Sequence, residues 1–319
     1  MGAVRRPRMH ADEVATDPDL VRRLVAGQFP EWSGLPVEPV DSAGTVNAVY
    51  RLGDTMAVRL PRIEGGVKDV ETEARWLPAL APALPVAIPA PLAKGRPAEG
   101  YPYPWSVHSW LPGANPSPGQ VAGADPLARD LAGFITALHR VDPAGGPPCY
   151  RSEPLTARDA ATRAAIGTLR GDIDTGAATA GWEAALGAPS WPGPSVWVHA
   201  DLSPGNVLLD AGRLSAVIDF GCVGLGDPAV DLIAAWSLFP APARTVFRTA
   251  LDVDDATWLR ARGWALSIAL SELAYYRATH PVMAATARHV LAELLMDAAG
   301  HPGGEARAAG GDGSGCASR

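Results

Sequence analysis

The sequence predicts an α+β chain of two lobes, with a mainly β N-terminal lobe and a helical C-terminal lobe. Short apolar runs broken by turn residues fill the chain up to about residue 111, which is typical of antiparallel strands. From residue 125 onward, apolar residues recur mostly at the spacing of amphipathic helices. A length of 319 residues is enough for about two lobes of ordinary size, each with its own hydrophobic core.

The composition is that of a folded protein and weighs against several classes of partner. Hydrophobic residues make up 47% of the chain and charged residues 19%. The net charge of −7 and the pI near 5.5 argue against nucleic acid, because phosphate backbones recruit dense Lys and Arg. No apolar run reaches the length of a membrane span, so we expect no membrane partner and a cytoplasmic location. The three cysteines are scattered, which fits neither a disulfide framework nor a zinc site.

The first lobe is expected to begin with a helix and to continue as a meander of strands. Asp17 and Pro18 form a helix start, with the carboxylate as the cap and proline at the first helical position. Strands are expected at 37–40, 46–52 and 56–60, followed by a helix at 68–80 stopped near Pro78 and Pro82, an edge strand at 84–92 and a strand at 102–111.

The second lobe is expected to be helical on both sides of a short β segment. Asp125 and Pro126 cap a helix through residue 140, and Asp227 with Pro228 starts another. Asp231 lies one turn into that second helix, where it either bonds back to the preceding loop or interacts with the helix dipole. We expect structural roles for Asp227 and Asp231. Further helices are expected at 155–169, 179–186, 243–251, 255–276 and 281–299.

The β segment carries three polar residues that strand formation alone does not explain. Two short apolar runs flank the turn at 210–213 and predict an antiparallel hairpin. A hairpin brings its outer ends together, so we expect Asn206 and Asp219 to lie side by side, with Asp201 a short loop away. Such a cluster is able to hold a divalent cation and a proton acceptor at once.

The spacing of these residues matches a template for phosphoryl transfer. The pattern H-x-D-L-x-x-x-N followed by D-F-G is formed by His199, Asp201, Asn206 and Asp219. In that template the first Asp accepts the proton of the substrate hydroxyl, and the Asn and second Asp hold Mg²⁺. Hard oxygen ligands suit this chemistry, because they fix Mg²⁺ against the negatively charged phosphate oxygens.

Two further features are candidates for nucleotide binding. Arg59 stands on the third expected strand where the template has a Lys that reaches the phosphates and pairs with a Glu on the next helix. Glu73 is the expected partner and Glu71 the alternative; the other interpretation of Arg59 is a solvated strand charge. The small-residue loop at 42–47, with Gly44, Thr45 and Asn47, either lays backbone N–H groups over the phosphates or is a plain hairpin turn.

Several motifs together carry a resemblance to a known family. They are HADLSPGN at 199–206, IDFG at 218–221 and GDPAVDL at 226–232, supported by the segments 44–53, 58–61 and 110–113. In this order and at this separation they resemble the aminoglycoside phosphotransferase family, whose relatives include choline kinases and the eukaryotic protein kinases. The resemblance extends from about residue 10 to residue 300.

The resemblance implies a bilobal protein kinase-like fold with ATP or GTP and Mg²⁺ held between the lobes. It implies Asp201 as the catalytic base, Asn206 and Asp219 as metal ligands and Arg59 as the cation that binds phosphate. His199 is expected to brace the catalytic loop by hydrogen bonding. The implied divisions are a nucleotide-binding lobe at 1–107, a hinge at 108–113 that holds adenine through Ser109, Trp110 and Leu111, a catalytic and acceptor-binding lobe at 114–300, and a disordered tail at 301–319.

The sequence departs from the family pattern at three positions, none of which removes the base or a metal ligand. Ala200 stands where the family usually has Gly, which adds a Cβ to a tight loop. Ser203 replaces the commoner His and Arg59 replaces Lys. The chain also lacks a Lys two residues after Asp201 and an A-P-E segment, both expected of protein kinases, so small molecules are the expected acceptors.

We expect a hydroxyl acceptor such as an aminoglycoside or related antibiotic, and therefore a possible role in antibiotic resistance. Acidic residues of the second lobe are candidates to receive an amine-bearing acceptor, and aromatic residues near them either line its pocket or pack the last helices. These residues are Asp252, Asp254, Asp255, Glu272, Trp264, Tyr275 and Tyr276. The alternatives are a metabolic kinase for choline, an amino alcohol or a sugar, a pseudokinase that binds nucleotide without turnover, and a metal-dependent phosphohydrolase.

Overall fold

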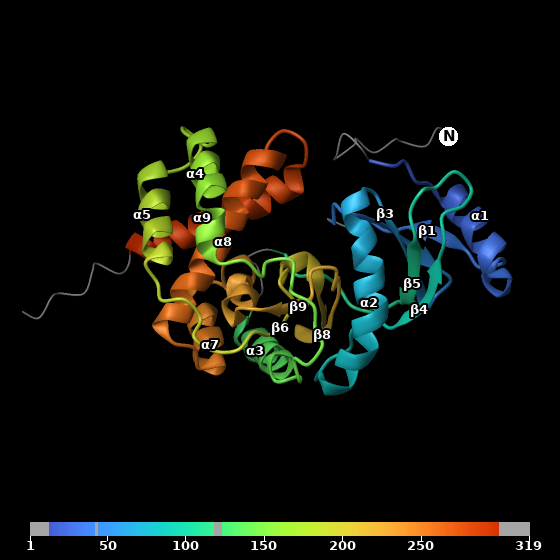
Figure 1. Cartoon of the computed structure of the whole chain (residues 1–319), viewed down its shortest axis with the longest axis horizontal. Coiled ribbons are helices and arrows are strands. Elements are labelled where there is room, and N and C mark those ends of the chain that lie inside the picture. Colours follow the sequence, from blue (N-terminus) through green and yellow to red (C-terminus); the bar gives the residue numbers. More distant parts are fainter. Residues whose placement is uncertain (1–12, 42–43, 118–122, 300–319) are drawn as a thin grey trace, which may run out of the picture.

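The protein consists of a β-rich N-terminal lobe and a helical C-terminal lobe, as expected from the sequence (Figure 1). The structure is a computed structural model that describes residues 13–41, 44–117 and 123–299. The tail expected at 301–319 lies outside the described residues, as do Ser42 and Ala43 of the small-residue loop. No helix in the described part of the chain is both long and apolar enough to cross a membrane.

The N-terminal lobe is built on a five-stranded antiparallel sheet. The strands are β1 (Val37–Pro39), β2 (Asn47–Leu52), β3 (Met56–Pro61), β4 (Pro91–Gly95) and β5 (Trp105–Ser109), in the order β1-β2-β3-β5-β4. Helix α1 (Pro18–Gln28) begins where expected, because the Asp17 carboxylate accepts a hydrogen bond from the Leu20 N–H at 2.7 Å. Its buried face packs with the sheet around Val58 and Trp105 in one hydrophobic core. Strand β3 lies near the middle of this sheet and carries Arg59.

Helix α2 (Val67–Leu80) lies between the two lobes (Figure 1). Leu77 and Leu80 near its end are buried in the core of the C-terminal lobe, while Glu73 faces strand β3 of the N-terminal lobe. The helix expected at 68–80 is confirmed to within one residue, and Pro78 lies inside its last turn. A proline in the last turn costs few intrahelical bonds, since the helix has little length left to lose.

The C-terminal lobe surrounds two small β ladders with helices. The ladders are β6 (Val196–Val198) with β9 (Gly224–Gly226) and β7 (Val207–Asp210) with β8 (Arg213–Val217). The helices are α3 (Asp125–His139), α4 (Asp159–Thr168), α5 (Thr175–Leu186), α6 (Ala234–Leu238), α7 (Ala241–Leu251), α8 (Asp255–Tyr276) and α9 (Pro281–Ala299). Short 3-10 turns precede α4 and α6, at Leu155–Arg158 and Pro228–Ile233. The expected bounds of α8 and α9 are confirmed, and Asp254 caps α8 through the Thr257 N–H.

Two expectations about element boundaries are corrected. The edge strand expected at 84–92 lies at β4, because the prolines of the earlier segment lack N–H donors and Ala87 pairs instead with Ala216 of β8. The Ala87 carbonyl accepts from the Val217 N–H at 3.1 Å, which ties this segment to the hairpin of the other lobe. Asp125 is the first residue of α3 and not its cap, which is Ala124.

Candidate active site

The hairpin β7–β8 brings the outer ends of its strands together as expected. Its two turn residues, Ala211 and Gly212, both have positive φ, the backbone twist that matches a tight two-residue hairpin. At the open end, the Asn206 carbonyl accepts from the Ile218 N–H at 2.9 Å. Asn206 and Asp219 therefore leave the hairpin from neighbouring positions.

Asn206 is bonded directly to Asp201. Its side-chain nitrogen donates to the Asp201 backbone carbonyl at 2.7 Å and to the Asp201 carboxylate oxygen Oδ2 at 3.0 Å. Because the nitrogen is committed to Asp201, only the amide oxygen of Asn206 can serve as a ligand for a cation. The donor set offered to a metal at this point is therefore one neutral oxygen and the carboxylate of Asp219, both of which suit Mg²⁺.

His199 braces the loop that carries Asp201. Its Nε2–H donates to the Ile218 carbonyl at 3.0 Å, and its Nδ1 accepts from the Asp201 N–H at 3.2 Å. One neutral tautomer satisfies both bonds, so the imidazole fixes the loop and is not free for proton transfer. This arrangement agrees with the bracing role expected from the sequence.

Asp231 holds the same loop from the other side. Its carboxylate is fully buried and accepts from the backbone N–H groups of His199 at 3.1 Å and Ala200 at 2.8 Å. It also contacts His139 Nε2 at 3.1 Å. Of the two roles left open for Asp231, bonding back to the preceding loop is the one observed. Asp227 is structural as well, since its carboxylate caps the following turn and pairs with Arg260 at 2.7 Å.

Two residues of the site have left-handed backbone conformations. Ala200 has φ 66° and Asp219 has φ 63°. A residue with a Cβ is disfavoured there, so surrounding bonds must hold both residues in place. The strain expected at Ala200, where the family usually has Gly, is therefore real.

Arg59 joins the two lobes through a pair of carboxylates. Its Nη1 donates to Glu73 Oε1 at 2.5 Å and its Nη2 donates to Asp219 Oδ1 at 2.6 Å. Burial alone would lower the pKa of Arg59, but the charges of Glu73 and Asp219 outweigh it and raise that pKa above its ordinary value. Glu73 also accepts from the Phe220 N–H at 3.0 Å. The solvated-charge interpretation of Arg59 is excluded, and Glu71 pairs with Lys94 on the surface instead.

Three ionisable residues of the site have surroundings that the sequence does not predict. The sequence predicts no role for Arg151 or Asp69, and for Glu272 it predicts only a candidate contact with the acceptor. Arg151 donates from Nη1 to the Ala200 carbonyl and to Asp201 Oδ1, the latter at 3.1 Å. Asp69 lies one turn before Glu73, and burial, with the charges of Glu73 and Asp219, raises its pKa to about 7. Arg151 and Asp69 lie outside the motifs that carry the family resemblance.

Glu272 of α8 is the third. Burial, followed by the charge of Asp201, raises its pKa to about 7, and Arg151 partly opposes the shift. The other candidate acidic residues of this lobe lie at the α7–α8 connection, where Asp254 is a helix cap and Asp255 pairs with Arg248. Trp264 is a core residue, whereas Tyr275 is 57% exposed.

The expected nucleotide loop leads into strand β2 and the expected hinge begins at the end of strand β5, and both strands pair with β3, which carries Arg59. Asn47 is buried at the start of β2, and Thr45 shares a hydrogen bond with Tyr276 at the end of α8. The N–H of Ser109 donates to the Ala90 carbonyl at 2.9 Å and that of Trp110 to the Thr55 carbonyl at 2.7 Å. These two N–H groups are therefore committed to hydrogen bonds within the N-terminal lobe.

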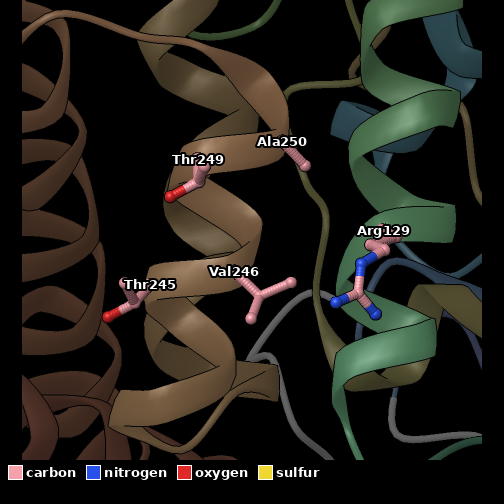
Figure 2. Close-up of a pocket in the computed structure, with 5 residues that line it drawn as sticks. All are labelled: Arg129, Thr245, Val246, Thr249 and Ala250. Atoms are coloured by element: carbon pink, nitrogen blue, oxygen red, sulfur yellow. The ribbon is translucent and has the colours of Figure 1, made fainter.

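A separate concave surface lies between α3 and α7, away from these residues (Figure 2). Figure 2 shows Arg129 of α3 facing the side of α7 that carries Val246 and Ala250, with Thr245 and Thr249 beside them. Among the described residues that line this surface, Arg129 supplies one guanidinium and none supplies a carboxylate.

Comparisons with known sequences point to one family. The chain matches the family model described as "Phosphotransferase enzyme family" over residues 38–264. The uncharacterized protein YcbJ of Bacillus subtilis (strain 168) is 26% identical over 160 residues, which cover 49% of this chain and 50% of that protein. The match therefore spans about half the length of that relative.

Solved structures share the whole fold. The GDP and kanamycin complex of APH(2")-IIia superposes with a TM-score of 0.70 at 20% identity, covering 87% of this chain and 98% of that one. The apoenzyme of macrolide 2'-phosphotransferase MphH from Brachybacterium faecium has a TM-score of 0.54 at 25% identity and covers 87% and 97%. The fold and the residues around Asp201 define a kinase-like phosphotransferase. The chain belongs to the phosphotransferase enzyme family.

Proposed function

We propose that the protein transfers the γ-phosphoryl group of ATP or GTP, with Mg²⁺, to a hydroxyl group of a small molecule. The observation that carries the proposal is the convergence of a base, a cation site and a phosphate-binding cation. Asp201 is bonded to Asn206, Asn206 is bonded to the strand end that leads to Asp219, and Asp219 is paired with Arg59. Each of these groups has a place in phosphoryl transfer.

Asp201 is proposed as the base that accepts the proton of the acceptor hydroxyl. Arg59, held by Glu73, is proposed to bind the nucleotide phosphates, and the loop with Gly44, Thr45 and Asn47 to cover them. Asn206 and Asp219 would hold Mg²⁺, which when bound neutralises phosphate charge. No cluster of three or more His, Cys, Asp or Glu side chains suited to a metal occurs within 13–41, 44–117 and 123–299, and Mg²⁺ commonly uses one or two protein carboxylates plus the phosphates.

The acceptor is proposed to be an amine-bearing molecule, with aminoglycosides and related antibiotics as the first candidates. The Glu272 carboxylate interacts electrostatically with Asp201, and a nearby ammonium group would favour its charged form. The APH(2")-IIia structure contains kanamycin, and MphH is a macrolide phosphotransferase. Choline, an amino alcohol or an amino sugar would satisfy the same carboxylate, so a metabolic kinase is the second candidate.

The test is ADP or GDP release from the nucleotide and Mg²⁺ across a panel of aminoglycosides, macrolides, choline and amino sugars. Transfer to at least one acceptor is expected, and Asp201→Asn should abolish it while leaving nucleotide affinity largely intact. Nucleotide binding without transfer to any acceptor would indicate a pseudokinase. Phosphate release without an acceptor, faster than any transfer, would indicate a hydrolase.

A further inference from the structure

Backbone hydrogen bonds of the two preceding residues hold Arg151 at the site, although Arg151 belongs to none of the sequence motifs. It lies in the connection between α3 and α4, where the Cys149 N–H donates to the Leu225 carbonyl at 3.0 Å and the Tyr150 N–H donates to the Cys222 carbonyl at 3.1 Å. Both acceptors follow Asp219 closely in the chain. The connection is therefore fixed to the segment that leaves the hairpin, and the Arg151 side chain, 13% exposed, is directed into the site.

The Arg151 guanidinium completes the hydrogen bonding of the Asp201 carboxylate. Its Nη1 donates to Asp201 Oδ1 at 3.1 Å, while Asn206 donates to Oδ2 at 3.0 Å. The two oxygens are thus held by two different elements. A carboxylate held at both oxygens has little freedom to rotate, which matters for a base that must meet a hydroxyl in one geometry.

The same guanidinium holds the peptide next to Asp201. Nη1 also donates to the carbonyl of Ala200, whose N–H is bonded to Asp231. Ala200 is buried and has φ 66°, a conformation that is disfavoured for a residue with a Cβ. Hydrogen bonds to its N–H and to its carbonyl keep Ala200 in that conformation. Because Asp201 is the next residue, the conformation of Ala200 sets the direction in which the Asp201 backbone leaves the loop.

We propose that Arg151 is a positioning residue for Asp201, which fixes the orientation of the catalytic carboxylate through one guanidinium nitrogen. The proposal rests on the proposed function for its kinetic readout, because Asp201 is the base only if the protein is a phosphotransferase. An ion pair that served only the stability of the fold would affect stability without a specific effect on kcat. For a positioning residue, loss of Arg151 is expected to lower kcat far more than it lowers stability or nucleotide affinity.

The kinetic test compares Arg151→Met, Arg151→Lys and a matched control, Arg163→Met, whose ion pairs with Asp159 and Glu183 lie on the surface. Arg151→Met should lower kcat about ten- to a hundredfold, the range of one hydrogen bond to a charged group, with the KM for nucleotide changed less than about twofold. Arg151→Lys should recover part of kcat, and the control should resemble wild type. A rise in nucleotide KM with unchanged kcat would show that Arg151 binds nucleotide, and the proposal would be wrong.

A double variant separates the carboxylate contact from the strain at Ala200. If Arg151 acts only by holding the left-handed backbone, Ala200→Gly should restore kcat in the Arg151→Met background, and that rescue would overturn the proposal. If Arg151 orients the carboxylate, the double variant should keep the kcat loss of Arg151→Met. Thermal melting of each variant identifies any that fail to fold, in which case Arg151→Lys supplies the comparison.

A crystal structure of Arg151→Met gives a readout that does not depend on activity. The Asp201 carboxylate should rotate away from its present orientation, while His199 keeps its bonds and Asn206 keeps its bond to the Asp201 backbone carbonyl. An unmoved carboxylate would contradict the proposal. Absence of transfer by the wild-type protein on every acceptor would instead contradict the proposed function, and the crystal structure would still decide the role of Arg151.

Discussion

The side-chain nitrogen of Asn206 donates to both the backbone carbonyl and the carboxylate of Asp201, at 2.7 and 3.0 Å. The proposed metal ligand and the proposed base are therefore one bonded unit. A change that keeps the size of Asn206 but removes its donor should affect both functions of the loop at once.

Asn206→Asp is such a change. It replaces the donor nitrogen with an oxygen and places a second carboxylate next to Asp201, which introduces like-charge repulsion. We expect kcat to fall by about a hundredfold or more, the scale of a misplaced general base, and the Mg²⁺ concentration for half-maximal rate to change. Steady-state kinetics over a Mg²⁺ series measures both. An unchanged kcat with an altered Mg²⁺ requirement would show that the bond to Asp201 is dispensable.

Arg59→Met tests the buried ion pairs between the lobes. Glu73 is 2% exposed and would be left as an unpaired buried charge, so we expect the free energy of unfolding to fall by about 3–5 kcal/mol. Chemical denaturation measures it. The control is Arg213→Met, which breaks the pair with Asp130 where the arginine is 64% exposed, and should cost much less stability. Equal losses in the two variants would mean that the Arg59 pairs contribute no more than surface pairs.

Ala200→Gly should stabilise the protein although it removes a methyl group from a buried position. The left-handed conformation of Ala200 costs nothing for glycine, and this outweighs the larger entropy of the unfolded glycine chain. We expect a gain of about 0.5–1 kcal/mol, seen as a higher midpoint in denaturant. Ala164→Gly, at an exposed position inside α4, should instead lose about 1 kcal/mol. A loss at both positions would show that Ala200 is not strained.

The raised pKa of Glu272 predicts a pH-dependent gain from Glu272→Gln. Its folded-state pKa of about 7 exceeds the ordinary value of 4.5, so between these values the folded state binds more protons than the unfolded state. Ionisation of Glu272, which burial and the charge of Asp201 oppose and the charge of Arg151 favours, therefore costs stability that grows as pH rises from about 4.5 and is complete above about 7.

The variant removes this cost. The melting temperature of Glu272→Gln should exceed that of wild type by a few degrees near pH 8 and by clearly less near pH 5, in thermal scans without acceptor. A difference that is the same at both pH values, or larger at the lower one, would mean that Glu272 is ionised at little cost in the folded protein.

Much of the fold could be predicted from the sequence because its signals are local. The Asp17 cap, the turn at Ala211 and Gly212, and the long apolar period of α8 each depend on neighbours a few residues away. The segment before β4 was misplaced because its pairing is not local. Ala87 bonds to a strand of the other lobe that lies far along the chain.

The sequence by itself determined the spacing of His199, Asp201, Asn206 and Asp219, and with it the class of chemistry, because one hairpin and one loop bring these residues together. Only the tertiary structure decided what surrounds them. Arg151, Asp69 and Glu272 come from three separate elements, and their contacts with the site depend on how the lobes and helices pack. Local patterns in a chain report which element forms, but distances between elements are set by packing and by the charges that packing buries.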